Sequence, residues 1–199
     1  VYKRQAYPSD CDILEGYRTR ARERDSRMDD PHRKRALAKA KEIKLLLLDV
    51  DGVLTDGNLL YGGSGEESKA FNTQDGFGIR RLIDAGFEVA VISGRRSVAA
   101  AKRMTELGVG HVILGTADKV AAFDELITSL GIVAAECAYA GDDIPDLPLL
   151  GKVGYSIAVA NAVEEVRDFC DYTTMASGGH GAVREICDLV LAAKPEAGR

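Results

Sequence analysis

The sequence predicts an α/β protein with a Rossmann-like, doubly wound and mostly parallel β-sheet, and with a small β-hairpin inserted after the first strand. Three observations support this fold class. The run Leu45–Leu48 is wholly apolar, as expected for a strand buried on both faces. From residue 36 onward, strand-like and helix-like segments alternate. The glycine-rich stretch Gly62–Gly65 separates two short strand-like segments and so indicates one hairpin.

Local signals assign the first half of the elements. Ala36 to Glu42 favours a short helix that leads into the strand Ile43–Leu48. Gly86 and Gly108 are expected to end two later helices, because glycine readily adopts the left-handed conformation, and Ser97 can cap the second helix. The elements expected after the first strand are the hairpin strands Asn58–Tyr61 and Glu66–Phe71, helix Gly78–Ala85, strand Phe87–Ile92 and a helix from Ser97 to Leu107.

The second half repeats the scheme of strand and helix. Gly131 is expected to end the helix that starts at Lys119. The expected elements are strand His111–Leu114, helix Lys119–Leu130, strands Ala138–Ala140 and Tyr155–Ala158, helix Ala162–Phe169, strand Tyr172–Thr173 and helix Ala182–Ala192. This alternation predicts a parallel sheet, because each crossover helix packs on the sheet and returns the chain to the end at which the previous strand began.

Composition narrows the class of protein. A chain of 199 residues with 46% hydrophobic and 29% charged residues is typical of a globular domain with one core. No apolar run approaches the roughly 20 residues needed to cross a bilayer, and no signal-peptide pattern is present, so we expect no membrane association. The four cysteines have no paired spacing that suggests zinc or disulfides, which predicts a cytoplasmic protein.

The charge of the chain is unevenly distributed. Residues 1–42 carry more basic than acidic side chains, although the whole chain has a net charge of −5. We expect residues 1–35 to form a mobile basic extension and residues 36–199 to form a single domain, with the hairpin insertion at 58–71. The cluster Arg33–Arg35 could contact nucleic acid, but it lacks interleaved aromatic residues and precedes an acidic domain. A solvated helix face is therefore favoured, and no nucleic-acid partner is predicted.

Two aspartates follow the first strand directly. Side chains alternate along a strand, so Asp49 and Asp51 are expected to start out pointing the same way. Ligands of open α/β sheets bind at the carboxyl ends of the strands, where this pair lies. Two carboxylates this close repel each other unless a cation joins them or one takes a proton. The pair therefore indicates a metal and phosphate site, and an acidic turn is the alternative.

Other polar groups occur where later strands should end. Ser93, Gly94 and Arg95 combine a hydroxyl, a flexible backbone and a guanidinium, which suit an oxyanion, although an ordinary strand-to-helix turn has the same pattern. Lys119 opens a helix, where a cation faces the unfavourable end of the macrodipole. Taken alone, it would be interpreted as an exposed lysine extending into water.

A second acidic cluster follows the strand Ala138–Ala140. It contains Asp142, Asp143 and Asp146, and a helix cap would account for only one of these carboxylates. Magnesium prefers carboxylate oxygens and keeps water and substrate phosphate as its other ligands. The two acidic clusters at neighbouring strand ends therefore predict a Mg²⁺ site.

In their order along the chain, these segments resemble the four motifs of the haloacid dehalogenase superfamily of phosphotransferases. The motifs are Asp49-x-Asp51-Gly52, Ser93, Lys119 and Gly141-Asp142-Asp143-x-x-Asp146. Further segments are similar to one subfamily, the 3-deoxy-D-manno-octulosonate 8-phosphate phosphatases of lipopolysaccharide precursor synthesis, over roughly residues 37 to 193. These are Asp56-Gly57, Lys69-Ala70-Phe71-Asn72, Asp75-Gly76-Phe77-Gly78-Ile79-Arg80 and Gly178-Gly179-x-Gly181-Ala182-Val183-Arg184-Glu185. In this subfamily the hairpin replaces a large cap domain.

The resemblance implies a role for each motif residue. Asp49 would be the nucleophile that forms an aspartyl-phosphate, and Asp51 the general acid and base. Asp49, the main-chain carbonyl of Asp51, and Asp142 would hold Mg²⁺. Ser93 and Lys119 would offset charge on the transferring phosphoryl group. Asp143 and Asp146 would steady the ion's waters or neighbouring groups.

The resemblance also implies a substrate site and an assembly. The substrate would be a sugar-acid phosphate, and the implied substrate-binding residues are Asn72, Thr73, Gln74, Asp75, Gly76, Arg80, Gly94, Arg95 and Arg103. Taken alone, Arg80 and Arg103 would be interpreted as residues of solvated helix faces. Members of the subfamily are homotetramers in which hairpins associate and a neighbour's C-terminal segment, here including His180 and Arg184, covers each active site. Leu59, Leu60 and Tyr61 would then be interface residues.

Two positions depart from the subfamily pattern. Gln74 stands where arginine is usual, and His180 stands where arginine or lysine is usual, so these two positions leave more than one substrate open while the phosphoryl-transfer motifs are intact. A nine-carbon ulosonate phosphate is the alternative substrate. A non-catalytic oligomerisation module of the same fold is a further alternative, as is a phosphoaspartate signalling receiver, in which the phosphorylated aspartate lies on a later strand.

Overall fold

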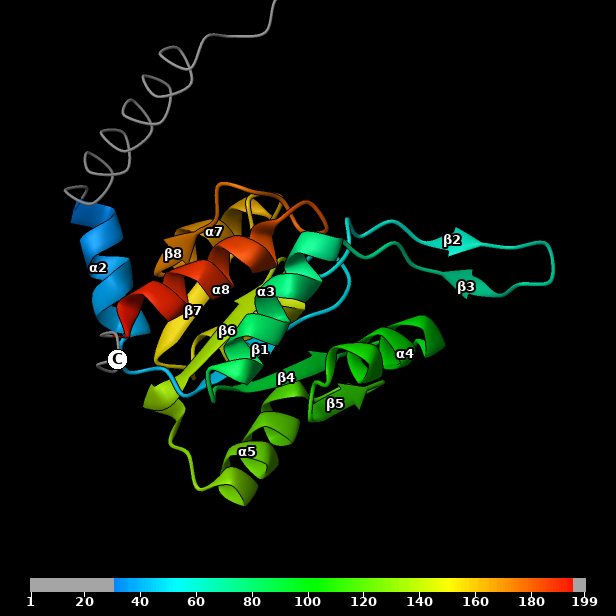
Figure 1. Ribbon diagram of the computed structural model, residues 1–199. Helices are drawn as coiled ribbons and strands as arrows, with labels where there is room; N and C mark the ends of the chain where they lie inside the picture. The colour runs from blue at the N-terminus through cyan, green and yellow to red at the C-terminus, as the bar shows by residue number, and fades with distance from the viewer. Residues whose placement is uncertain (1–30, 195–199) are drawn as a thin grey trace, which may run out of the picture. The chain divides into compact units, whose positions relative to one another are not determined.

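The computed structural model describes residues 31–194 (Figure 1). Contacts within the chain divide it after Ala36, and the fold described below lies in the unit that begins at Leu37. Residues 1–30 of the expected extension lie outside the described residues. Helix α2, Pro31–Ala40, begins before the expected start at Ala36, with a proline at its first position, where a missing N–H does no harm. Lys34 and Arg35 are exposed on this helix, in agreement with a solvated face.

A six-stranded sheet forms the centre of the fold, and every pair of neighbouring strands in it is parallel. The order of strands across the sheet is β5-β4-β1-β6-β7-β8. The strands are β1 (Leu45–Leu48), β4 (Glu88–Ser93), β5 (His111–Leu114), β6 (Cys137–Gly141), β7 (Tyr155–Ala158) and β8 (Tyr172–Thr173). All four leucines of β1 are buried, as predicted for a central strand covered on both faces. The predicted doubly wound parallel sheet is thus confirmed.

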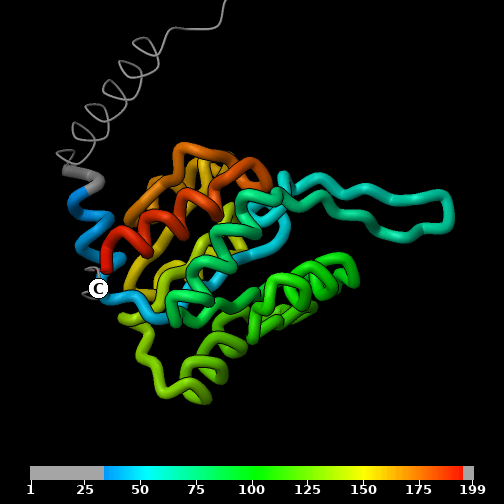
Figure 2. Tube along the Cα trace, viewed as in Figure 1, coloured from blue at the N-terminus to red at the C-terminus, as the bar shows by residue number. Residues whose placement is uncertain are grey.

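Helices cover the sheet in two groups. Helix α3 contacts α4 and α8, while α5 contacts α6; α3 and α8 run side by side (Figures 1 and 2). The helices are α3 (Thr73–Asp84), α4 (Val98–Leu107), α5 (Lys119–Leu130), α6 (Leu147–Leu150), α7 (Glu164–Phe169) and α8 (Ala182–Ala193). Within residues 31–194, no helix has the length and apolar character needed to cross a membrane.

The order of the strands explains where a ligand can bind. From β1 the chain proceeds outward to β4 and β5, and then returns to β6 on the other side of β1. Strand β1 therefore lies at the point where the winding reverses, and ligand crevices of doubly wound sheets form at the carboxyl ends of the strands at this point. Asp49 is the first residue after β1.

The predicted hairpin is present, with shorter strands than expected. Strands β2 (Leu60–Tyr61) and β3 (Glu67–Ser68) pair antiparallel, with Leu60 opposite Ser68 and Tyr61 opposite Glu67. The hairpin extends away from the sheet at the end to which β4 points (Figure 1). No large cap domain accompanies it within the part of the chain that the structure describes.

Some element boundaries differ from the sequence-based expectation. Helix α3 begins at Thr73 rather than Gly78, because Asn72 accepts a hydrogen bond from the Gln74 N–H at 2.7 Å and caps the helix. Helix α7 begins at Glu164 rather than Ala162. Helix α6 and the 3₁₀ turns Ala134–Glu136 and Ile144–Asp146 were not predicted, since segments this short carry no periodic signal.

Candidate active site

Residues from four elements meet at the carboxyl end of the sheet. Asp49 follows β1, Ser93 ends β4, Asp142 follows β6, and Lys119 is the first residue of α5. Because β4 and β6 flank β1, the parallel topology brings these strand ends together. Asp49 and Ser93 are buried, and Lys119 and Asp142 are partly buried. The structure therefore assembles the residues that the four motifs identified.

Lys119 joins the two acidic clusters. Its Nζ lies 2.9 Å from Asp49 Oδ1 and 2.6 Å from Asp146 Oδ1. The Tyr139 hydroxyl donates to Asp146 Oδ1 at 2.6 Å, and Asp146 Oδ2 accepts hydrogen bonds from the N–H groups of Asp142 at 2.9 Å and Asp143 at 3.3 Å. Both oxygens of the buried Asp146 are thus engaged, and this side chain fixes the loop that presents Asp142.

Burial and mutual repulsion raise the pKa values of the two other carboxyl groups, those of Asp49 and Asp142. Burial, opposed by the charge of Lys119, raises the pKa of Asp49 to about 6. Burial, together with the charges of Asp146 and Asp49, raises the pKa of Asp142 to about 7. Although burial lowers the pKa of Lys119, the carboxylates of Asp49 and Asp146 raise it overall. A further cation nearby would stabilise the ionised form of these buried carboxylates, because it would offset their mutual repulsion.

The carboxylate cluster fits a divalent cation. Asp49, Asp142 and Asp146 each offer an oxygen, and these oxygens lie within 4.8 Å of one another. Asp49 Oδ1 is buried and receives no well-directed hydrogen bond, although Lys119 forms an ion pair with it. Hard oxygen donors of this kind suit Mg²⁺. Since Asp146 is already hydrogen-bonded at both oxygens, Asp49 and Asp142 have the side chains best able to hold the ion.

Asp143 and Asp51 lie outside this group of three. The exposed Asp143 caps the 3₁₀ turn that follows it, and its Oδ1 accepts a hydrogen bond from the Ile144 N–H at 2.8 Å. The Asp51 carboxylate instead contacts Lys69 from the hairpin, and its Oδ2 lies 3.7 Å from Arg95 Nε.

The residues at the turn after β4 differ from one another in their burial and in their contacts. Ser93 is buried, and its Oγ accepts a hydrogen bond from the Arg95 N–H at 3.3 Å. Gly94 is exposed. The Arg95 guanidinium points to the hairpin, where Nη2 donates to Glu67 Oε2 at 2.7 Å and to the Tyr61 hydroxyl at 3.2 Å.

A pocket of about 350 Å³ lies where the base of the hairpin, the start of α3 and the loop before α8 meet. The pocket brings together Asn72 and Thr73, which were predicted to bind the substrate, and His180, which was predicted to belong to a neighbour's covering segment. The other lining residues are Asp56, Ala70, Phe71 and Gly179. Gln74 is exposed in the first turn of α3.

Four other predicted substrate-binding residues, Asp75, Gly76, Arg80 and Arg103, make contacts elsewhere in the chain. Asp75 is buried and accepts hydrogen bonds from the N–H groups of Arg184 at 2.7 Å and Gly181 at 3.3 Å, so it caps α8. A Cβ on Gly76 would lie 2.3 Å from Arg103 Nη2, so these two residues pack together.

The remaining arginines have protein partners of their own. Arg80 donates to the Leu107 carbonyl at 3.2 Å, at the end of α4. Arg103 lies 3.5 Å from Glu106, and Arg184 pairs with Asp188 at 2.8 Å and lies over the Phe77 ring. Within one chain, none of these three side chains lines the pocket.

The loop before α8 packs on the loop that follows Asp51. Asn161 bridges them: its Nδ2 donates to the Gly52 carbonyl at 3.0 Å, and its Oδ1 accepts from the Gly178 N–H at 2.6 Å. A Cβ at Gly178 would lie 1.8 Å from the Gly52 oxygen, so only glycine permits this approach. His180 reaches the pocket of its own chain in this way.

Sequence reasoning missed three residues of the site. Lys69, Glu67 and Tyr139 contact Asp51, Arg95 and Asp146 respectively. For Glu67 and Lys69, the alternation of side chains along a strand could have given a signal. The two residues lie two positions apart, so their side chains are expected on the same face of the hairpin. Tyr139 lies within a strand assigned to the core, where a tyrosine is usually a packing residue.

Comparisons with known proteins show that this chain is similar to phosphatases. A family model described as haloacid dehalogenase-like hydrolase matches residues 111–186. The 3-deoxy-D-manno-octulosonate 8-phosphate phosphatase of Escherichia coli K12 is 48% identical over 158 residues, which are 79% of this chain and 84% of that protein.

Solved structures agree with this relationship. The Moraxella catarrhalis 3-deoxy-D-manno-octulosonate 8-phosphate phosphatase, in complex with magnesium ion, phosphate ion and a KDO molecule, has a TM-score of 0.78 and 46% identity, and the match covers 80% of this chain and 91% of that one. The cobalt-bound Haemophilus influenzae phosphatase has a TM-score of 0.76 and 43% identity, with coverage of 78% and 91%.

Proposed function

Because the chain belongs to the 3-deoxy-D-manno-octulosonate 8-phosphate phosphatase family of haloacid dehalogenase-like hydrolases, we propose that it releases inorganic phosphate from that eight-carbon sugar-acid phosphate, a lipopolysaccharide precursor. The observation that carries the proposal is the cluster of Asp49, Asp142 and Asp146 at the carboxyl end of the sheet, in which the Lys119 ammonium pairs with Asp49 and Asp146. This arrangement offers a nucleophile, a cation site and a fixed positive charge in one place.

The proposed reaction has two displacement steps at phosphorus. A carboxylate oxygen of Asp49 attacks the phosphorus atom, the bond from phosphorus to the sugar oxygen breaks, and Asp51 gives that oxygen a proton. A water molecule then attacks the phosphorus of the aspartyl-phosphate, gives its proton to Asp51, and displaces the Asp49 carboxylate. Both aspartates are thereby restored, and the products are the sugar acid and inorganic phosphate.

A Mg²⁺ ion would be held by side-chain oxygens of Asp49 and Asp142 and by the main-chain carbonyl of Asp51. When bound, it supplies positive charge that offsets the repulsion between the phosphate and the carboxylates. Asp146 fixes the loop of Asp142 through the N–H bonds described above. Asp143, which caps the adjoining turn, steadies the same loop or the ion's waters.

Ser93 and Lys119 would bind the phosphoryl oxygens. The Ser93 hydroxyl is buried at the end of β4, and the Lys119 ammonium lies beside the nucleophile. Preorganised hydrogen-bond donors and charges stabilise the negative charge that develops in the transition state, and this stabilisation usually makes the largest contribution to the rate enhancement. The phosphate also explains why a lysine begins a helix, since the incoming anion complements the cation.

The sugar acid would occupy the pocket beside the start of α3, where Asn72, Thr73 and His180 supply polar groups. The other proposed substrate residues are Gln74, Asp75, Gly76 and Arg80 of α3, Gly94 and Arg95 of the turn after β4, and Arg103 of α4. Guanidinium groups suit the sugar carboxylate because they bind both of its oxygens.

We also propose a homotetramer in the cytoplasm. Leu59 and Leu60 on the hairpin are exposed, as expected for residues that a second copy would cover. In the assembly, the C-terminal segment of a neighbour would cover the active site; within one chain, His180 lines the pocket and Arg184 pairs with Asp188. The described cysteines, Cys137, Cys170 and Cys187, are free thiols, which suits a reducing compartment. Light scattering tests the assembly, and a monomeric mass would contradict it.

A phosphate-release screen tests the proposed substrate. The purified chain with Mg²⁺ is compared on 3-deoxy-D-manno-octulosonate 8-phosphate, a nine-carbon ulosonate 9-phosphate, and glucose 6-phosphate. We expect the eight-carbon substrate to have the highest kcat/KM. A clear preference for the nine-carbon compound would identify the alternative substrate, and a preference for glucose 6-phosphate would contradict both. Absence of release from all three would leave the non-catalytic module of the same fold.

A further inference from the structure

Four charged side chains form a closed ring beside the catalytic centre. Lys69 Nζ contacts Asp51 Oδ1 and lies 3.2 Å from Glu67 Oε1. Arg95 completes the ring, with Nη2 2.7 Å from Glu67 Oε2 and Nε 3.7 Å from Asp51 Oδ2. Each of the four carboxylate oxygens therefore faces one cation. The ring links three separate segments: the loop after β1, the hairpin, and the turn after β4.

The register of the hairpin explains how the ring forms. Tyr61 lies directly opposite Glu67, so both side chains are on one face of the hairpin, and both accept hydrogen bonds from Arg95. Lys69 lies two residues beyond Glu67 and therefore points to the same face. A shift of one residue in the register would turn Glu67 and Lys69 away from Asp51.

The burial of Lys69 is unusual for a lysine. Its side chain is 1% exposed, whereas the ion-paired side chains of Lys44 and Lys152 are 57% and 40% exposed. Lysine is almost never buried unless it is paired, because an ammonium taken out of water needs compensating charge. Among the described lysines that form ion pairs, the least exposed are Lys69 and Lys119, which contact Asp51 and Asp49 respectively.

We propose that Lys69 and Glu67 are positioning residues, through which the hairpin of the same chain holds the Asp51 carboxylate in its catalytic orientation. The proposal rests on the acid and base role proposed for Asp51. The Asp51 side chain is 19% exposed, and its carboxylate forms ion pairs with Lys69 and Arg95. Lys69 and Arg95 restrain one oxygen each, and Glu67 holds these two cations apart.

The proposal predicts a loss that depends on the leaving group. A sugar alkoxide needs a proton in order to leave, so its departure depends on a correctly placed acid. The p-nitrophenolate ion is a much weaker base and leaves without one. Loss of orientation at Asp51 should therefore slow hydrolysis of the sugar-acid phosphate more than hydrolysis of p-nitrophenyl phosphate.

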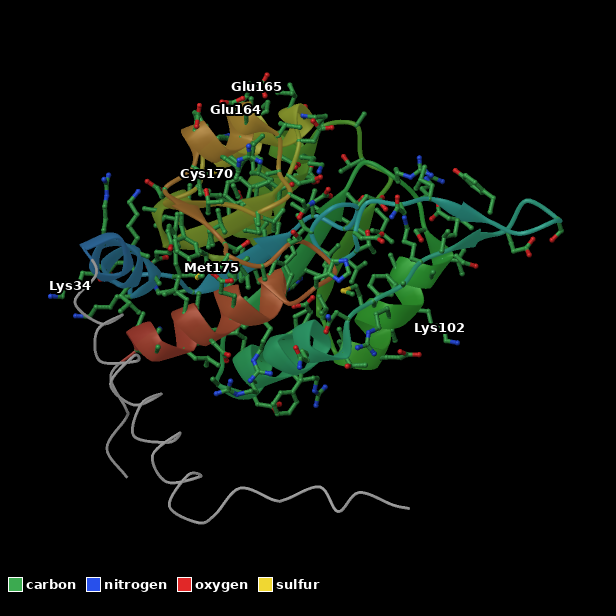
Figure 3. The ribbon with its side chains drawn as sticks, turned by 90° about the horizontal axis from the view of Figure 1, so that it is seen from above. Lys34, Lys102, Glu164, Glu165, Cys170 and Met175 are labelled. Carbon is green, nitrogen blue, oxygen red and sulfur yellow. The ribbon has the colours of Figure 1, made fainter. Side chains whose placement is uncertain are left out.

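The experiment measures kcat and KM of the full chain with Mg²⁺ on both substrates. Lys69→Met keeps most of the side-chain volume and removes the charge, and Glu67→Gln removes the anion that holds the two cations. Lys102→Met is the control, because Lys102 is an exposed lysine on the outside of α4 (Figure 3).

For Lys69→Met we expect kcat on 3-deoxy-D-manno-octulosonate 8-phosphate to fall roughly 10- to 100-fold, with KM changed less than about threefold. The loss on p-nitrophenyl phosphate should be below about threefold. Glu67→Gln should show the same selectivity with a smaller loss, and Lys69→Arg should restore most of the rate. The double variant should lose less than the product of the two single losses, because the residues act through one ring.

Equal losses on the two substrates would overturn the positioning role and show a structural one, and so would unchanged kinetics. Should Lys69→Met fail to fold, Glu67→Gln on both substrates decides the question in the same way. If the wild-type chain hydrolyses neither substrate, the proposed function itself fails and the positioning role with it. An active wild-type chain with non-selective variants removes the positioning role alone.

Discussion

Lys119 Nζ lies 2.9 Å from Asp49 Oδ1, which joins the first residue of α5 to the first residue after β1. A cation at a helix N-terminus is unfavourable because it faces the positive end of the macrodipole. The carboxylates of Asp49 and Asp146 offset this cost, and Asp118 caps the helix through the N–H groups of Val120 and Ala121. The position of Lys119 is thus explained by the site rather than by the helix.

Replacing Lys119 with methionine should reduce kcat by roughly 100- to 1000-fold, because the fixed charge beside the transferring phosphoryl group is lost. Phosphate release under saturating Mg²⁺ measures the effect. Lys102→Met, an exposed lysine on α4, serves as the control and should keep wild-type kcat. A Lys119→Met protein that folds and works at the wild-type rate would remove this residue from the machinery.

The acidic cluster should make the metal-free protein less stable as pH rises. Asp49 and Asp142 have folded-state pKa values of about 6 and about 7, against an ordinary 3.8. Between these values the folded protein keeps protons that the unfolded chain has released, so both groups lower stability progressively from pH 4 to pH 7. Asp142→Asn should therefore raise the Tm of the metal-free protein more at pH 8 than at pH 4.

Magnesium should reverse this pH dependence, because its ligands must be ionised. A ligand at a hundredfold excess over its Kd adds about 2.7 kcal/mol, which corresponds to roughly 5–10 °C in Tm for a domain of this size. We expect a rise of that order on adding Mg²⁺ at pH 8 and a much smaller rise at pH 5, measured by thermal unfolding. An equal rise at both pH values, or in Asp142→Asn, would contradict the assigned site.

Gly178→Ala should damage both stability and activity. The added Cβ would lie 1.8 Å from the Gly52 carbonyl oxygen, so the loop that follows Asp51 must shift. Overpacking of this kind costs about 1–3 kcal/mol, and kcat should fall with it. Gly63→Ala, in the hairpin turn with no atom within 4 Å of the new Cβ, is the matched control and should be neutral. Similar behaviour of the two variants would contradict the close packing of the loops.

His180→Arg should strengthen binding of the acidic sugar. Arginine brings a permanent charge and a planar guanidinium, which can bind both oxygens of the sugar carboxylate, into the pocket in place of the His180 imidazole. We expect KM for the eight-carbon substrate to fall roughly 5- to 30-fold at pH 8 with kcat little changed. His111→Arg, at the start of β5 and outside the pocket, should leave KM unaltered. A KM that His180→Arg leaves unchanged would exclude contact with the substrate.

The sequence predicted the elements best where long-range packing and local signals agree. Helix α5 has the expected bounds, because Asp118 and Gly131 provide a cap and a left-handed stop. The start of helix α3 was predicted wrongly, at Gly78 rather than at Thr73. Gly78 in its first turns packs closely against Arg184 and Cys187 of α8, and this contact between distant segments is a tertiary effect.

The same distinction holds at the site. Asp49, Ser93, Lys119 and Asp142 could be predicted because strand ends meet at one edge of a parallel sheet. Lys69 could not be assigned to Asp51, because the path of an inserted hairpin depends on its register and on side chains far along the chain. Asp75 could not be recognised as a cap of α8, because its hydrogen bond with the Arg184 N–H joins residues that are 109 positions apart in the sequence.

The most direct test of the proposed function is phosphate release from 3-deoxy-D-manno-octulosonate 8-phosphate by the wild-type chain and by Asp49→Asn. Asp124→Asn, which alters an exposed ion pair with Lys152, is the control. We predict Mg²⁺-dependent release by the wild type and the control, lost after chelation, and at least roughly 1000-fold lower in Asp49→Asn. Wild-type rates in Asp49→Asn, or release that persists without the metal, would contradict the assignment of Asp49 as the nucleophile of a magnesium-dependent phosphatase.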